Sequence, residues 1–312
     1  SEKKYRMKKY IIVFYFIRGL KLICNLFLRE YNVFMNKKLG IPYMGSKRAI
    51  SKNIVDFILE ENPNCKYVYD LFGGGGAISF ELLQRPQIEK VFYNELNTGV
   101  VELLKKIKQD GVTKEFFNWI DRETFNLHKN DDTWLGGLIK TCWSFGNNQK
   151  GYLFGKDIEL LKKEAHEYLL QNGYNGEKEL RSKLLKEFKE KAKIDGRFEL
   201  QQLEQLEQLE RLEQLERLEQ LELSNLSYID VKIDTPIEET IIYLDPPYIN
   251  TAKYAEDINH KELYDFIKNT KYKVYLSSYE SPLKEVFSIE KKSLLASGKN
   301  QKTVQEKLFT NQ

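Results

Sequence analysis

The sequence predicts an α/β protein built on a mainly parallel sheet. Apolar, strand-favouring runs alternate with segments whose apolar residues recur at helical spacing, which is typical of a parallel sheet covered by helices. Chemically distinctive residues directly follow three of the expected strands: a glycine loop after 66–72, Glu95 after 91–94 and Asp245 after 241–244. Ligands bind outside the carboxyl ends of such strands, so we expect one site there.

The composition is that of a globular protein with one large or two ordinary domains in 312 residues. Basic residues number 49 and acidic residues 46, so the net charge is only +3 and any basic surface for nucleic acid must be local. The three cysteines, Cys24, Cys65 and Cys142, are far apart and show no metal-ligand spacing. We therefore expect a cytoplasmic protein with reduced thiols and no metal.

Residues 1–40 differ in composition from the rest of the chain, and we interpret them as an amino-terminal extension. Their apolar runs are interrupted by Arg18 and Lys21 and fall short of the roughly 20 residues that a membrane span needs. No small-residue cleavage site follows convincingly, so we expect no membrane role. The extension is either an added helix or translated sequence upstream of a true start at Met35.

Residues 41–112 have the pattern of a nucleoside-binding βαβ unit. The strand 66–72 leads into four glycines at 73–76, which leave the backbone free for a close approach to a ligand before a helix begins. Glu95, at the end of the second strand, is placed for ribose hydroxyls. Ile78 stands where a dinucleotide fingerprint needs glycine or alanine, so NAD fits less well.

A turn at 42–48 opens the expected helix 49–60. Lys47 and Arg48 are unfavourable near a helix start unless an anion lies close by, which makes them candidates for binding one. The alternative is that both are simply solvated.

Residues 113–199 lose the strand pattern and are expected to be mostly helical. The stretch 143–152 interleaves aromatic, amide and cationic side chains, a mixture that can stack on bases and hydrogen-bond to them. A core of buried aromatics beside a polar loop would look the same. The candidate DNA contacts are Lys140, Trp143, Asn147, Asn148, Lys150 and Tyr152.

Residues 200–223 form an array of Leu-Glu-Gln and Leu-Glu-Arg triplets. On a helix, a three-residue period turns each leucine by about 60° from the last, so the leucines spiral around the axis and no heptad stripe exists. We interpret the array as a spacer or self-contained helical insert before residues 224–312.

Asp245 and the two prolines after it define a stiff loop at the end of a buried strand. Asp245 and the Pro246 carbonyl accept hydrogen bonds and do not donate them, and Tyr248 adds a flat aromatic face. This set suits the exocyclic amino group of a flat base. Alone, it could also be an ordinary turn with a surface tyrosine.

Together these motifs resemble those of the Dam-type, alpha-group DNA adenine-N6 methyltransferases, in the order that this family has them. The match extends over about residues 41–309, without the triplet array. Around the recognition region, the chain is similar to phage and prophage members. The segments that carry the resemblance are 42–47, 70–76, 94–95, 143–152, 155–159 and 245–248.

The resemblance implies a Rossmann-like class I methyltransferase fold, with a seven-stranded sheet and an inserted, mostly helical target-recognition domain at 113–199. It implies S-adenosylmethionine as methyl donor, with Tyr43 and Lys47 toward its methionine portion, and no metal. Catalysis at N6 of a flipped-out adenine would rest on Asp245, Pro246 and Tyr248. The implied cofactor residues are Tyr43, Lys47, Asp70, Phe72, Gly73, Gly75, Glu95 and Asp245.

The implied partner is double-stranded DNA, bound by a monomer or weak dimer. The recognised site, a cognate restriction endonuclease and a contact from Asp230 to the cofactor's adenine stay open. The alternatives are a methyltransferase acting on RNA or on N4 of cytosine, and a relative that binds DNA without catalysis.

Overall fold

The structure, a computed structural model, describes residues 39–213, 215, 217–247, 258–292 and 303–312. They belong to the compact unit Leu39–Gln312. The predictions for the extension up to residue 38, and that for Tyr248, lie outside the described residues.

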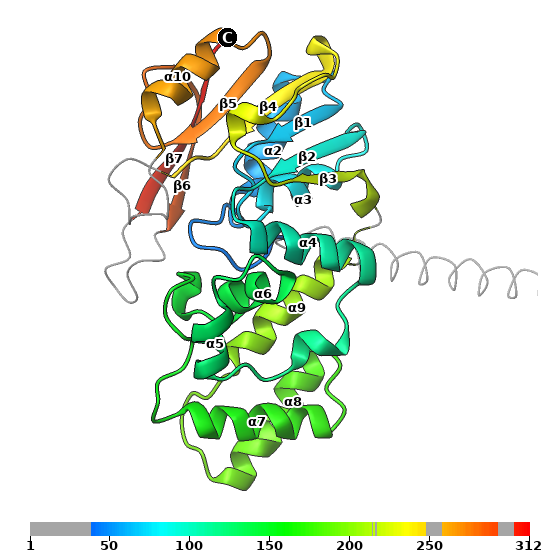
Figure 1. The fold of residues 1–312 in the computed structure, drawn as a ribbon, viewed down its shortest axis with the longest axis vertical. Helices are drawn as coiled ribbons and strands as arrows, with labels where there is room; N and C mark the ends of the chain where they lie inside the picture. Colours follow the sequence, from blue (N-terminus) through cyan, green and yellow to red (C-terminus); the bar gives the residue numbers. More distant parts are fainter. Residues whose placement is uncertain (1–38, 214, 216, 248–257, 293–302) are drawn as a thin grey trace, which may run out of the picture. The chain divides into compact units, whose positions relative to one another are not determined.

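A seven-stranded sheet with the order β3-β2-β1-β4-β5-β7-β6 forms the upper part of Figure 1. The five neighbouring strands β3, β2, β1, β4 and β5 pair in parallel. Strand β7 lies between β5 and β6 and is antiparallel to both. This confirms the predicted α/β class with a mainly parallel, Rossmann-like sheet. The strands are β1 (Tyr67–Asp70), β2 (Lys90–Asn94), β3 (Leu221–Ser224), β4 (Thr240–Leu244), β5 (Lys273–Ser278), β6 (Lys284–Lys292) and β7 (Thr303–Thr310).

Helices cover both faces of this sheet. On one face, Ile242 and Leu244 form a buried cluster with Leu263 of α10 (His260–Asn269). Side chains alternate along a strand, so Tyr275 of β5 points to the other face, where it contacts Phe57 of α2 (Ser51–Glu61) at 6.3 Å between ring centroids. Helix α3 (Ala77–Leu83) lies beside α2 and begins at the glycine loop.

A helical region is inserted between β2 and β3, as predicted. Its helix α4 (Thr98–Asp110) packs on β3 of the sheet. Helix α6 (Trp134–Cys142) packs on α4, and the two approach closely at Gly99 and Gly137. The other described helices of the insertion are η1 (Lys114–Phe117), α5 (Arg122–His128), η2 (Phe145–Asn147), α7 (Glu159–Gln171), α8 (Lys178–Ala192), α9 (Gln201–Glu213) and η3 (Leu218–Gln220). Two short helices, η4 (Tyr228–Asp230) and η5 (Ile237–Glu239), lie between β3 and β4.

The triplet array is a core element, so its interpretation as a spacer is wrong. It forms α9, whose leucines Leu203, Leu206, Leu209 and Leu212 are all fully buried. The leucines do spiral, as the period requires, but α9 packs against α4, α6 and η1. A helix with neighbours on several sides needs apolar residues around more of its circumference than a stripe provides.

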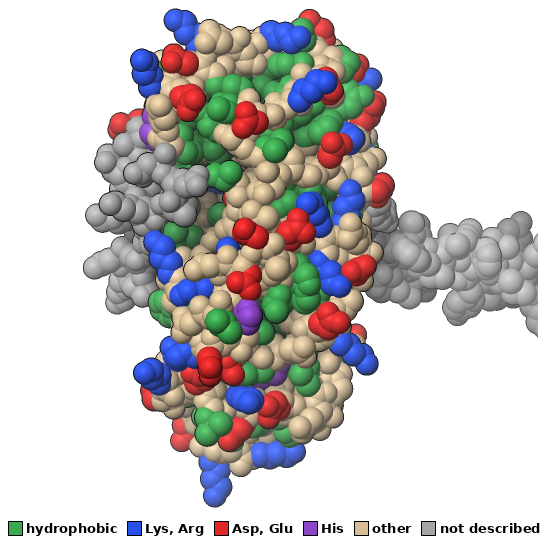
Figure 2. Space-filling view, in the orientation of Figure 1, with side chains coloured by type: hydrophobic (Ala, Val, Ile, Leu, Met, Phe, Trp, Pro, Cys, Tyr) green, Lys and Arg blue, Asp and Glu red, His purple; other side chains and the backbone are tan. Residues whose placement is uncertain are grey.

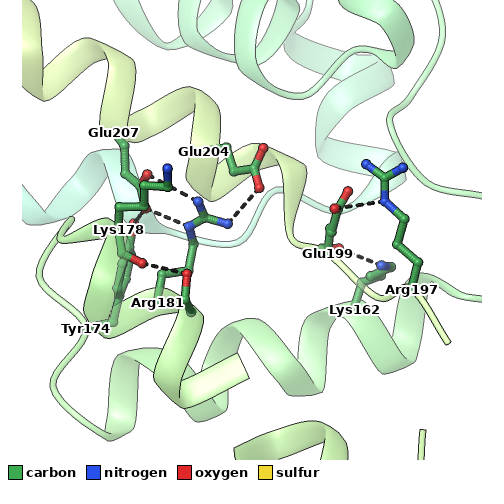
Figure 3. Close-up of polar contacts among 9 residues, drawn as sticks. Lys162, Tyr174, Lys178, Arg181, Arg197, Glu199, Glu204 and Glu207 are labelled. Atoms are coloured by element: carbon green, nitrogen blue, oxygen red, sulfur yellow. Dashed lines mark hydrogen bonds and ion pairs between the residues drawn. The ribbon is translucent and has the colours of Figure 1, made fainter. Parts of the chain in front are cut away.

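Polar residues of the array are also used inside the helical region. Figure 3 shows Arg181 of α8, whose guanidinium contacts Glu204 and Glu207 of α9, each at 2.7 Å. The Tyr174 hydroxyl donates to Glu207 at 2.9 Å. Glu207 is 4% exposed, and these donors satisfy a buried carboxylate that would otherwise be costly.

The end of the array enters the sheet as β3, a strand that the sequence did not predict. From Leu221 the triplet gives way to Leu-Glu-Leu-Ser, a two-residue alternation in which Leu221 is buried and Glu222 is exposed. That change of period is the signal for a strand. The array therefore connects the helical region directly to the sheet edge beside β2.

Candidate active site

Three acidic side chains meet at the carboxyl ends of adjacent strands. Asp70 is the last residue of β1, Glu95 follows β2, and Asp245 follows β4, and β1 lies between the other two strands. Parallel strands end at the same edge of a sheet, so these residues lie near one another, as we expected from the sequence.

The glycine loop after β1 is shaped by close internal packing. A Cβ on Gly73 would lie 2.1 Å from the Tyr93 ring, and the Gly73 N–H donates to the Asn94 carbonyl at 2.8 Å. A Cβ on Gly75 would lie 2.9 Å from Cβ of Tyr43. The protein's own side chains thus require glycine at both positions, and Tyr43 lies against the loop.

Glu95 is bound by backbone donors. Its carboxylate accepts from the N–H groups of Gly74 at 2.8 Å and Asn97 at 2.9 Å. Burial raises its pKa, while these bonds and the Lys140 ammonium act in the opposite direction. The acid is therefore held rigidly at the end of β2, facing the glycine loop.

Asp70 is a buried carboxyl with one oxygen unused by the described residues. It is 1% exposed, and its Oδ2 accepts from the Ser79 hydroxyl at 2.7 Å. Its Oδ1 is buried and has no hydrogen-bond partner among the residues that the structure describes. Burial, with smaller contributions from Asp245 and Glu95, raises the pKa of Asp70 to about 7.

Lys47 forms an ion pair with the predicted catalytic carboxylate. Its Nζ lies 2.8 Å from Asp245 Oδ1 and 3.5 Å from Glu306 Oε1, and its side chain is 5% exposed. Burial alone would lower the pKa of Lys47, but the two carboxylates outweigh it and the pKa is raised. Lys47 is thus a charged partner of Asp245, a contact that the sequence did not predict. The sequence analysis did not single out Glu306, which lies in β7 beside the polar residues Gln305 and Lys307.

An apolar surface adjoins Glu95. The rings of Phe72 and Tyr228 pack at 5.1 Å between centroids. Leu96 and Leu226 are both exposed. The Asn225 side chain donates to the Leu96 carbonyl, and the Asn94 side chain donates to the Leu226 carbonyl. Exposed leucines beside a fixed acid can cover the face of a flat ring.

Three of the predicted DNA contacts are buried and must be corrected. Trp143 is 0% exposed and packs edge-on against Trp119 at 5.1 Å, so it has no face for a base. Tyr152 is buried and donates its hydroxyl proton to the Ile120 carbonyl. Lys140 is buried and donates to the Asn97 side chain at 3.1 Å, which turns it toward Glu95. The alternative of a buried aromatic core beside a polar loop was correct here.

The loop 144–151 displays the remaining candidates. Asn147 has a φ of +56° and donates from Nδ2 to the Thr141 carbonyl, and Asn148 Oδ1 accepts from the N–H groups of Lys150 and Gly151. These asparagines shape the loop, while Lys150 is exposed at its end. Phe145, which the sequence did not single out, is 65% exposed.

The loop is linked to the acid after β2. Asn97, whose N–H binds Glu95, donates from Nδ2 to Gln149 Oε1 at 3.1 Å. On the face shown in Figure 2, acidic and basic side chains are intermingled, in line with the balanced composition.

The described part of the chain holds no group of three or more His, Cys, Asp or Glu residues arranged for a metal ion. Within the same part, no helix is long and apolar enough to cross a membrane.

The sheet order defines a Rossmann-like α/β protein, with acids and a glycine loop at the carboxyl edge of its parallel strands. Residues 43–293 match the family described as D12 class N6 adenine-specific DNA methyltransferase, and the chain belongs to this family. A crystal structure from Haemophilus influenzae, named "putative methylase HI0767", is similar at 13% identity with a TM-score of 0.31, covering 87% of this chain and 91% of that one. No curated protein matches the chain.

Proposed function

We propose that this protein transfers the methyl group of S-adenosylmethionine to N6 of a flipped-out adenine in double-stranded DNA. The observation that carries the proposal is the position of Asp245, in a chain of this family, at the carboxyl end of β4 and 2.8 Å from the Lys47 ammonium. A carboxylate in that contact stays ionised and accepts hydrogen bonds only.

The residues at the carboxyl edge fit S-adenosylmethionine, which supplies an electrophilic methyl group on a positively charged sulfur. Asp70 offers a buried acceptor oxygen that no described residue uses. Glu95 would accept from the ribose hydroxyls, and Leu96 and Leu226 would cover the flat ring of the adenine moiety. Tyr43, Phe72, Gly73 and Gly75 would line the same pocket.

Asp245 and the Pro246 carbonyl would act on the amino group of the target base. The N6 electron pair is delocalised into the ring, and accepting its hydrogens draws electron density back to nitrogen. N6 then bonds to the methyl carbon as the carbon–sulfur bond breaks with its pair on sulfur, and the surplus N6 proton passes to solvent. The base must leave the helix stack to reach this edge. Stacking by Tyr248 stays a prediction.

The DNA would contact the loop 144–151. Phe145 offers an exposed ring and Lys150 a cation, and Asn97 connects this loop with Glu95. Because contacts of this kind release counterions from phosphates, affinity should fall as salt rises.

The test is transfer of labelled methyl from S-adenosylmethionine to unmethylated genomic DNA by the full chain. We expect transfer by the wild type and at least an about 100-fold lower kcat for Asp245→Asn, by analogy with loss of a preorganised transition-state contact. Asp234→Asn, at a carboxylate that is 64% exposed, is the matched control and should keep full activity. Transfer to RNA alone, or equal transfer by Asp245→Asn, would contradict the proposal.

A further inference from the structure

Glu306 is a buried carboxylate far in sequence from every motif. Its side chain is 1% exposed, and it comes from β7, the antiparallel strand beside β5. An ionised carboxylate is rarely buried to this extent unless other groups compensate its charge. Its location is therefore informative.

At least two groups compensate Glu306, and one leads to the active site. The Ser277 hydroxyl of β5 donates to Glu306 Oε1 at 3.0 Å. The Lys47 ammonium lies 3.5 Å from the same oxygen and 2.8 Å from Asp245. Lys47 therefore joins a carboxylate on the last strand to the carboxylate that follows β4.

The charges of this triad do not cancel. One ammonium faces two carboxylates, and in a low-dielectric interior each interaction is strong. If Lys47 faced Asp245 alone, the pair would be neutral and the ammonium would withdraw electron density from Asp245 only. With Glu306 present, the ammonium is shared between the two carboxylates and withdraws less electron density from Asp245. Asp245 is then a better acceptor for an amino group.

We infer that Glu306 is a positioning residue for the methyl transfer, holding the Lys47 ammonium beside Asp245 and sharing its charge so that Asp245 stays an electron-rich acceptor. This inference rests on the proposed function. It assigns to β7 a part in the reaction and gives a reason for the burial of an acid in this strand.

Glu306→Gln is the informative substitution, because glutamine keeps the size and can still accept from Ser277. We expect kcat for methyl transfer to fall about 10- to 100-fold, as for other transition-state electrostatic contacts, and the single-turnover rate constant to fall equally. The Kd for S-adenosylmethionine, measured by calorimetry, should change less than about threefold, because the inferred role concerns the base. Glu306→Asp should recover part of the lost kcat. Glu285→Gln, at an exposed acid on β6, is the matched control and should match the wild type.

A second substitution tests whether Glu306 acts through Lys47. On a Lys47→Met background, Glu306→Gln should cause no further loss of kcat, because the ammonium that it holds is gone. An equal loss on both backgrounds, or a kcat of Glu306→Gln within twofold of the wild type, would overturn the inference. A wild type that transfers no methyl to DNA would refute the proposed function instead, so the two failures are distinguishable.

Discussion

Asp70→Asn is expected to stabilise the ligand-free protein while weakening its binding of S-adenosylmethionine. The pKa of Asp70 is raised by burial from 3.8 to about 7, so ionising it in the folded state is unfavourable. A difference of about 3 pKa units at 1.36 kcal/mol each corresponds to about 4 kcal/mol. Asparagine has the same shape, can accept from Ser79 and carries no charge.

The sign of the pH dependence is set by proton binding. Between the unfolded value of 3.8 and the folded value of about 7, the folded state binds more protons, so this group lowers stability as pH rises. The gain from Asp70→Asn should be small near pH 4, about 1.6 kcal/mol at pH 5 and about 4 kcal/mol at pH 8. At roughly 2 °C per kcal/mol, the last figure is an increase in Tm of about 8 °C.

Thermal and urea unfolding of the wild type and Asp70→Asn at pH 5 and pH 8 measure this directly. Asp234→Asn is the control, since its carboxylate is exposed and should give the same small effect at both pH values. Affinity for S-adenosylmethionine at pH 8 should fall about 10- to 100-fold if Asp70 binds a charged donor of the ligand. Destabilisation by Asp70→Asn at pH 8 would refute the reasoning.

Three further predictions concern the helical region. Leu209→Ala in α9 should lower the free energy of unfolding by about 2–5 kcal/mol. The control Leu160→Ala, at a side chain that is 68% exposed, should change it little. Equally small effects of both substitutions would support the spacer interpretation. Arg181→Met should cost about 3–5 kcal/mol in urea unfolding because it leaves Glu207 buried without its cation, and Arg181→Met with Glu207→Leu should recover much of that loss. His166 is buried, and that burial lowers its pKa, so the free energy of unfolding should fall as pH drops below about 6.5. In unfolding curves measured over a series of pH values, His166→Gln should make this fall shallower. An unchanged dependence of the free energy on pH would contradict the prediction.

The strand ends were predictable because their signals are local. A buried apolar run followed directly by an acid or a glycine loop identifies Asp70, Glu95 and Asp245, and parallel topology brings such ends together. The local signal of β5 is its strand-favouring apolar run from Val274 to Leu276. The start of α10 also has a local signal, because Asn259 caps it by accepting from the Glu262 N–H.

The triplet array shows where local pattern reasoning fails. The leucine spiral was correctly derived, but whether a helix stands alone or is surrounded depends on distant partners such as α4 and α6. Similarly, the sequence around Trp143 could not distinguish a ring that stacks on bases from one that packs against Trp119. Tertiary environment decides both cases.

Glu306 was hidden for a related reason. Nothing near it in sequence carries chemistry, and its role depends on β7 being inserted antiparallel next to β5, which brings it to Lys47 from the opposite end of the chain. Gly73 differs again, because the sequence explained it by ligand approach, whereas Tyr93 already requires glycine there.

The most direct test of the central claim is to identify the methylated atom. Unmethylated DNA, incubated with the full chain and S-adenosylmethionine, would be digested to nucleosides and analysed by mass spectrometry against standards. The account predicts N6-methyldeoxyadenosine, formed at least about 100-fold more slowly by Asp245→Asn. N4-methyldeoxycytidine, or no modified nucleoside from a protein that binds S-adenosylmethionine, would contradict it.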